Sequence, residues 1–143
     1  MDAKKFTKVC RCTLNGEVKI LETSVVKQNV DDVKKVLRES RRPALRVSLT
    51  LNAATLCLVH NLPNSAIDVL SFAIRCIVDS DYSRALNASG GRRFRAIVNK
   101  NAALTLATAL DKIYRSLGHK EMAKAKAFVI NTYRMMRDDY LME

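Results

Sequence analysis

The sequence predicts a mainly α-helical protein, a single-domain bundle of about five helices that follows an N-terminal β-hairpin. A length of 143 residues fits one domain. The hydrophobic content of 48% and the charged content of 27% lie in the globular range. Beyond residue 28, apolar side chains recur mostly every three or four positions, as on one face of a helix. We therefore expect residues 1–28 to form an arm and residues 29–143 to form the helical core of the one domain.

The arm is predicted to contain a β-hairpin over residues 5–24. Asn15-Gly16 is typical of a two-residue type I′ turn between strands. With this turn Thr13 pairs with Val18, and the remaining pairs mix polar and apolar side chains. The pattern indicates a partly exposed ribbon outside the core.

The first helix is expected to begin at Val30. Asn29 can cap it, and Asp31 and Asp32 then lie in the first turn, where acidic groups oppose the positive end of the helix. Pro43 ends the helical pattern.

Residues 44–60 fit two patterns. An alternation typical of a strand is formed by Leu45, Val47, Leu49 and Leu51. Helical spacing is found for Leu45, Leu49, Ala53, Leu56 and His60. We favour a helix, because Pro43 suits a first helical position and the segment is long for a strand.

The next helix is predicted from Asn64 or Ser65 to about Val78, after a break at residues 62–64. It is apolar nearly all round, so we expect it to be buried on several sides as the central element. A separate short helix is expected to start at residues 79–81 and to end at Leu86. Small and polar residues at 87–91 then predict a hinge or an exposed loop.

Two further helices are predicted near 95–117 and 120–141. Gly118 occupies the C-terminal cap position of the first of these helices. Its inward side is expected to consist of Ala103, Leu106, Ala107, Leu110, Ile113, Tyr114 and Leu117. The inward side of the last helix is expected to consist of Met122, Ala125, Val129, Tyr133, Met136 and Tyr140.

The distribution of charge predicts a polyanionic partner. The formal net charge is +11, from 25 basic and 14 acidic side chains. Residues 51–80 contain one basic side chain, Arg75, against Asp68 and Asp79. The excess of positive charge therefore lies in the two flanks of a nearly neutral apolar middle, which is typical of a nucleic-acid-binding domain.

Basic side chains cluster beside two breaks in the helical pattern. The first cluster surrounds Pro43 and consists of Arg38, Arg41, Arg42 and Arg46. The second follows Gly90-Gly91 and consists of Arg92, Arg93 and Arg95. We predict that these arginines contact phosphate, and that Lys120 and Lys124, with Arg134 and Arg137 further along, extend the surface along the last helix. The structural alternative is a solvated basic face whose arginines neutralise acids such as Glu39 and Asp81.

The aromatic residues favour RNA over DNA as the partner. The chain has no Trp, and only Phe94 and Tyr82 lie near arginines outside the apolar faces. Residues expected in the core are Phe72, Tyr114, Phe128 and Tyr133. A shortage of exposed rings for base stacking favours recognition of backbone and shape, as in double-helical RNA.

Four cysteines raise the question of a metal. Cys10 and Cys12, together with Cys57 and His60, supply zinc-ligand types, but their spacing is poor for a zinc site. We expect reduced thiols, no metal and no cofactor, and the zinc site stays as the open alternative.

An enzyme, a membrane protein and a small-molecule binder are not expected. The chain lacks the short catalytic motifs, and His60 and His119 lie at helix ends where a structural role suffices. No segment resembles a signal peptide or a membrane span, which favours the cytoplasm, with the nucleus as the alternative.

In size, basicity, cysteine usage and absence of catalytic motifs, the chain resembles small accessory RNA-binding proteins of RNA viruses. That resemblance implies a silencing suppressor or a nucleocapsid component. Our hypothesis is a homodimer that binds RNA backbone with low sequence specificity, because the apolar helices exceed what one small core encloses. The alternative is a helical protein-interaction module with a basic face for an acidic partner.

Overall fold

The computed structural model describes residues 23–87 and 97–140. Within these ranges the chain forms five α-helices and one short 3₁₀ helix, and no strand. The elements are α2 (Thr23–Glu39), α3 (Pro43–Val59), α4 (Pro63–Asn87), α5 (Ile97–Ser116), η1 (Lys120–Met122) and α6 (Ala125–Tyr140). The prediction of a mainly α-helical bundle of about five helices is confirmed.

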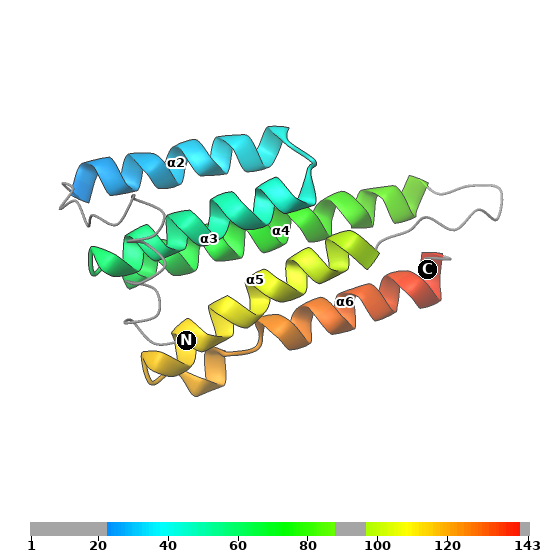
Figure 1. Cartoon of the computed structure of the whole chain (residues 1–143). Helices are drawn as coiled ribbons and strands as arrows, with labels where there is room; N and C mark the ends of the chain where they lie inside the picture. The colour runs from blue at the N-terminus through cyan, green and yellow to red at the C-terminus, as the bar shows by residue number, and fades with distance from the viewer. Residues whose placement is uncertain (1–22, 88–96, 141–143) are drawn as a thin grey trace.

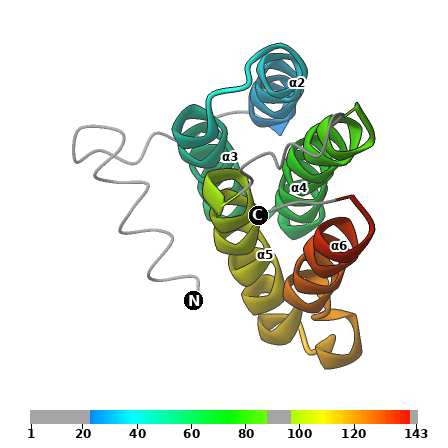
Figure 2. The same cartoon turned by 90° about the vertical axis from the view of Figure 1, so that its right-hand side faces the viewer.

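The helices lie side by side, and consecutive helices run in opposite directions (Figure 1). Seen end-on, α2 lies over α3 and α4, and α5 and α6 lie on the other side (Figure 2). Helix α4 packs against all four other helices. This arrangement confirms the predicted central element and explains why α4 is apolar on several sides.

The alternation of direction places particular helix ends together. The C-terminal ends of α2, α4 and α6 lie at the same end of the bundle as the N-terminal ends of α3 and α5 (Figure 1). The opposite end holds the start of α6, the end of α5 and η1. None of the described helices is long and apolar enough to cross a membrane.

Helix α2 begins earlier than predicted. Asn29 is not a cap, since it lies inside a helix that starts at Thr23, and Asp32 accepts a hydrogen bond of 2.9 Å from Gln28 one turn earlier. Val26 is fully buried, so it extends the apolar face of the helix by one turn. The boundary expected between residues 28 and 29 therefore falls inside α2, and the hairpin predicted at 5–24 otherwise lies outside the described residues.

Residues 44–60 are helical as favoured, with Pro43 as the first residue of α3. The buried face is displaced from the predicted one, since Leu45 is 37% exposed while Ala54 and Cys57 are fully buried. Asn61 adopts a φ of 58° after the helix, and Leu62 donates its N–H to the carbonyl of Cys57. This left-handed residue ends α3 and turns the chain into α4.

The break predicted at residues 79–81 is wrong. Helix α4 runs without interruption to Asn87, and Asp81 is fully buried inside the bundle. Aspartate favours helix starts in an isolated sequence. Here buried hydrogen-bond partners from other helices hold its carboxylate within a helix.

The end of α5 follows the prediction. Gly118 has a φ of 82°, and His119 donates its N–H to the carbonyl of Tyr114 at 2.9 Å. Leu117 and Met122 were expected inward, but they are 41% and 52% exposed. The reason is that η1 and a short turn separate the two helices, so α6 begins at Ala125 rather than at residue 120. Val129, Tyr133 and Met136 are buried as predicted.

Candidate nucleic-acid interface

Six arginines gather where three helices end and α3 begins, and we call this region the arginine end. It consists of Arg38, Arg41, Arg42, Arg46, Arg84 and Arg137. The first four are predicted site residues that surround the turn between α2 and α3. Arg84 and Arg137 join them from the last turns of α4 and α6. Arginines distant in the sequence therefore meet at one end of the fold.

Arg46 is buried and held in place. Its side chain is only 5% exposed. Its Nε donates to the carbonyl oxygen of Ser40 at 2.7 Å, and its Nη2 donates to the carbonyl oxygen of Leu37 at 3.4 Å. These carbonyls belong to the end of α2, where backbone oxygens lack partners within the helix. No carboxylate of the described residues forms an ion pair with Arg46, so its charge is not neutralised there.

Arg84 is held by a buried polar network. One oxygen of Asp81 accepts hydrogen bonds from Arg84 at 3.3 Å and from Asn99 at 2.9 Å. The other oxygen accepts the hydroxyl of Tyr133 at 2.6 Å. Burial, together with this hydrogen bond to Asp81, raises the pKa of Tyr133, so the hydroxyl keeps its proton and donates. The network joins α4, α5 and α6 and holds the guanidinium of Arg84 through its Nη1.

Arg38 is positioned by an aromatic ring. Its guanidinium carbon lies 5.1 Å from the centre of the Phe72 ring, and the ammonium of Lys34 lies 5.4 Å from the same centre. Lys34 also pairs with Asp68. Phe72, expected in the core, is half-buried and supports two cations.

A cleft of about 480 Å³ opens at the arginine end between α2, α3 and α4. We call it the arginine cleft, and its basic lining consists of Arg38, Arg41, Arg46 and Arg84. Helix α4 adds Ser80, Ser83 and Asn87 along one face, together with the carboxylate of Asp79. The cleft thus combines four guanidinium groups with neutral hydrogen-bonding groups and one acid.

The side chains of Arg41 and Arg42 have no hydrogen-bond partner in the described part of the chain, although the backbone of Arg42 takes part in the start of α3. Both side chains are exposed and form no ion pair with a described residue. Arg42 immediately precedes α3, whose N-terminus has no side-chain cap. A helix dipole favours cations at C-terminal ends, which accounts for Arg38, Arg84 and Arg137. It disfavours cations at the start of α3, so it does not account for Arg42, which directly precedes that helix.

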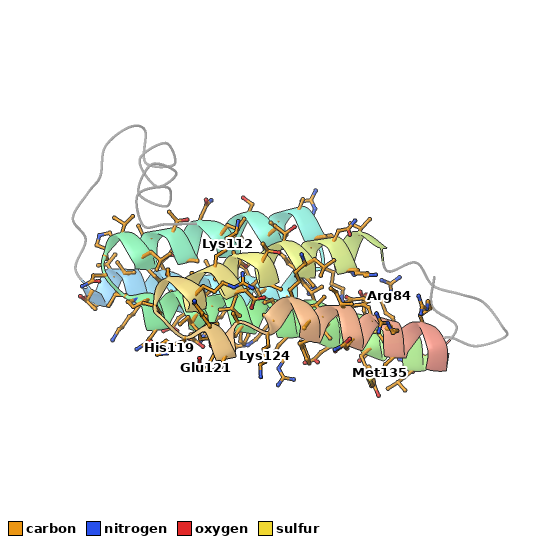
Figure 3. The ribbon with its side chains drawn as sticks, turned by 90° about the horizontal axis from the view of Figure 1, so that it is seen from below. Arg84, Lys112, His119, Glu121, Lys124 and Met135 are labelled. Atoms are coloured by element: carbon orange, nitrogen blue, oxygen red, sulfur yellow. The ribbon has the colours of Figure 1, made fainter. Side chains whose placement is uncertain are left out.

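A second group of cations lies at the opposite end of the bundle, and we call it the lysine end. It consists of Lys112, Arg115, Lys120, Lys124 and Lys126, all exposed. Figure 3 shows Lys124 and Glu121 near the start of α6 and Arg84 toward its other end. Arg137 follows Lys124 by thirteen positions along α6, and a helix of that length rises by about 20 Å. Lys120 and Lys124 therefore lie too far away to line the arginine cleft. The structure separates these predicted site residues into two groups.

The start of α6 is stabilised from another helix. Asp111 of α5 is 3% exposed and accepts the backbone N–H groups of Ala125 at 2.8 Å and Lys126 at 3.1 Å. This carboxylate replaces the side-chain cap that the sequence lacks before α6. It also offsets part of the positive charge that lysines place at this helix end.

Three predicted site residues, Arg92, Arg93 and Arg95, lie outside the described residues. The segment that carries them joins Asn87 of α4 to Ile97 of α5. Both of these anchor points lie at the arginine end (Figure 1).

The described part of the metal-ligand set does not form a site. Cys57 is fully buried, and burial raises the pKa of its thiol to about 11, which disfavours the thiolate that binds zinc. His60 places Nδ1 at 2.9 Å from the carbonyl oxygen of Leu56. No group of three potential ligands occurs within residues 23–87 and 97–140, while Cys10 and Cys12 lie outside them.

Besides Phe72, one more aromatic residue differs from the prediction. Phe128, expected in the core, is 43% exposed, with the guanidinium of Arg75 5.9 Å from the centre of its ring. Tyr133 is buried as expected, and Tyr82 is 37% exposed on α4. Phe94 lies outside the described residues.

Comparison with known proteins finds no matching family model, no matching curated protein and no matching solved structure. The assignment therefore rests on the residues of this chain alone.

Arg84 is the arginine of the cleft that the sequence prediction missed, together with the polar residues of α4 beside it. Once α4 is known to be continuous, Ser80, Ser83, Arg84 and Asn87 fall on one helical face. The spacing of these four residues is visible in the sequence. A prediction that ends the helix at Val78 does not place them on one helical face.

Proposed function

We propose that this protein binds nucleic acid, with RNA favoured over DNA, through phosphate contacts made by the arginine end. The observation that carries the proposal is the pair Arg41 and Arg42, exposed at the positive end of α3 without an ion-pair partner among the described residues. The dipole of α3 disfavours cations directly before Pro43, although the end of α2 at Glu39 favours them. A bound phosphate would stabilise both arginines, because guanidinium groups and the backbone N–H groups at a helix start both favour anions.

The binding is proposed to have low sequence specificity. Phosphate contacts fix the position of a nucleic acid but carry no base information. The described residues that line the arginine cleft include no aromatic ring on which a base could stack. Arg92, Arg93 and Arg95 are proposed to add contacts, since their segment is anchored at the same end.

The proposal includes a homodimer, but the excess of apolar helices no longer supports it. The apolar surface of α4 is covered by the four other helices of the same chain. Exposed apolar side chains, such as Val98 at 68% on α5, Met135 at 56% on α6 and Leu86 at 54% on α4, are candidates for a contact between copies. Sizing of the full chain, free and with RNA, tests the dimer.

The test is a salt titration of binding with two matched double variants. Each variant removes two exposed cations, Arg41→Ala/Arg42→Ala at the arginine end and Lys120→Ala/Lys124→Ala at the lysine end. The probe is a duplex RNA of about 20 base pairs, with DNA of the same sequence for comparison. Fluorescence anisotropy gives the dissociation constant at each salt concentration.

The logarithm of the association constant falls as the logarithm of the salt concentration rises. We expect the Arg41→Ala/Arg42→Ala variant to make this slope less steep by about two, close to 0.9 for each lost phosphate contact. The lysine variant keeps more of the slope, because it removes only long-range attraction. Equal losses in the two variants contradict the arginine end as the interface. A wild-type affinity that does not respond to salt instead favours a protein-interaction module for an acidic partner.

A further inference from the structure

The arginine cleft is an open hollow between α2, α3 and α4, and Arg42 lies outside its described lining on an exposed turn. Its volume of about 480 Å³ lies in the range of small-ligand sites, roughly 300–1,000 Å³. A nucleic-acid duplex is a convex rod, so its internal phosphates contact an exposed surface more readily than the interior of a cleft. The end of a strand is free of this restriction, and a terminal phosphate can enter.

The charge in the cleft suits a phosphomonoester better than a phosphodiester. Four arginines line the cleft, Asp79 is the one carboxylate among its described lining residues, and Asp81 behind the lining pairs with Arg84, which leaves an excess of two positive charges. A phosphomonoester carries a charge of about −1.5 to −2 near pH 7, compared with −1 for a diester. It also presents three oxygens that accept hydrogen bonds, which matches the paired donors of guanidinium groups.

Three of these arginines are held in position without a ligand. Arg46 is fixed by backbone carbonyls, Arg84 by the Asp81 carboxylate and Arg38 by the Phe72 ring. Binding therefore costs less side-chain entropy than it does for free surface cations. Arg46 matters most, because its buried charge has no ion-pair partner among the described residues.

Neutral donors complete the lining. Ser80, Ser83 and Asn87 lie along one face of α4, and their hydroxyl and amide groups can donate to phosphate oxygens. Since no described lining residue is aromatic, the phosphate rather than the base is the group that this cleft can distinguish.

We propose that the arginine cleft binds the terminal phosphate of a nucleic-acid strand and so distinguishes a phosphorylated end from a hydroxyl end. The proposal rests on the nucleic-acid binding proposed above. It adds a chemical preference that contact with internal phosphates does not produce.

The experiment compares one short duplex RNA with 5′-phosphate, 3′-phosphate or hydroxyl ends, at fixed salt, by fluorescence anisotropy. Wild-type protein is expected to bind at least one phosphorylated form about tenfold more tightly, the equivalent of one or two charge-assisted hydrogen bonds. Adenosine monophosphate and a phosphoserine peptide serve as competitors that carry the same phosphomonoester on other molecules.

Ser83→Asp is the decisive variant, because it adds a carboxylate to the cleft at an exposed position without removing a described contact. It is expected to reduce the preference for phosphorylated ends to less than about twofold; the preference is the ratio of the two affinities, so a loss of affinity common to both RNAs leaves it unchanged. The matched control is Asn64→Asp, which makes the same change of charge at an exposed site at the other end of α4. The control is expected to keep the tenfold preference.

The outcomes separate this proposal from the proposed function. Failure of wild-type protein to bind any of the RNAs removes both. Equal binding of phosphorylated and hydroxyl-ended RNA removes the terminal-phosphate site and leaves nucleic-acid binding intact. A preference that survives Ser83→Asp also overturns the cleft as its source, and so does tighter binding of the monophosphate or the phosphopeptide than of phosphorylated RNA.

Discussion

The two ends of the bundle both carry an excess of positive charge, but they hold it differently. At the arginine end, Arg46 donates to backbone carbonyls and Arg84 to a buried carboxylate. At the lysine end the cationic side chains are exposed and form no ion pair with a described residue. The first arrangement places donors at fixed points, whereas the second supplies a field without fixed geometry.

The difference shows that net charge alone does not define a binding site. Guanidinium groups that are already held can recognise the shape of a phosphate group, and flexible ammonium groups mainly raise the rate of encounter. We therefore expect substitutions at the arginine end to alter both stability and selectivity, and substitutions at the lysine end to alter neither strongly.

The largest effect is expected for Arg46→Ala. This change leaves the carbonyls of Leu37 and Ser40 without their described side-chain donor and opens the corner between α2 and α3. We expect the free energy of unfolding to fall by about 3 kcal/mol. Urea denaturation followed by circular dichroism measures it. Lys124→Ala at the lysine end is the control, with an expected change within about 0.5 kcal/mol. Similar losses in the two variants would remove the distinction between the ends.

A smaller effect is expected for Tyr133→Phe, which removes one hydrogen bond from the network beneath Arg84. At neutral pH the loss should be about 1–2 kcal/mol. Because the folded pKa of Tyr133 is raised above the usual 10.0, its contribution is complete below pH 10 and is lost as the pH rises further. Denaturation midpoints from pH 8 to 11 measure this difference.

In this pH series the Tyr133→Phe variant is the control for every titrating group other than Tyr133. Cys57, whose pKa is raised to about 11, weakens the fold at alkaline pH in both proteins, so the difference between them isolates Tyr133. A gap between wild type and Tyr133→Phe that stays constant above pH 10 would show that the hydroxyl is not held by Asp81.

The smallest effect concerns an exchange of cations that leaves the net charge unchanged. Arg41→Lys/Arg42→Lys is expected to weaken RNA binding by about threefold to tenfold, because an ammonium loses the paired donors of the guanidinium. Lys120→Arg/Lys124→Arg at the lysine end should change affinity by less than about twofold. Anisotropy titrations at fixed salt measure both, and losses of the same size would mean that only charge matters.

Much of the fold could be predicted because local signals were strong. Pro43 resolved the ambiguity of residues 44–60 in favour of a helix, and Gly118 marked the end of α5 through its left-handed backbone. Apolar side chains on nearly all sides of α4 correctly indicated its central position. These features depend on residues close together in the sequence.

The errors have a common cause, since each depends on contacts between distant residues. Asp81 was read as a helix start, but Asn99 and Tyr133 hold it inside a helix. The start of α6 is set by Asp111 of another helix, and the burial of Arg46 depends on how α2 meets α3. For the candidate site, the arginines around Pro43 were visible in the sequence. Their union with Arg84 was not, because it requires the packed bundle.

The carboxylate of Asp111 makes formation of the last helix conditional on its predecessor. A helix of 16 residues is marginal in isolation, and α6 has no acidic residue of its own in its first turn. During synthesis, the segment from Ala125 onward emerges after α5, so the group that starts it is already in place. The order of the chain thus favours an order of folding in which α6 is added last to a scaffold formed by the earlier helices.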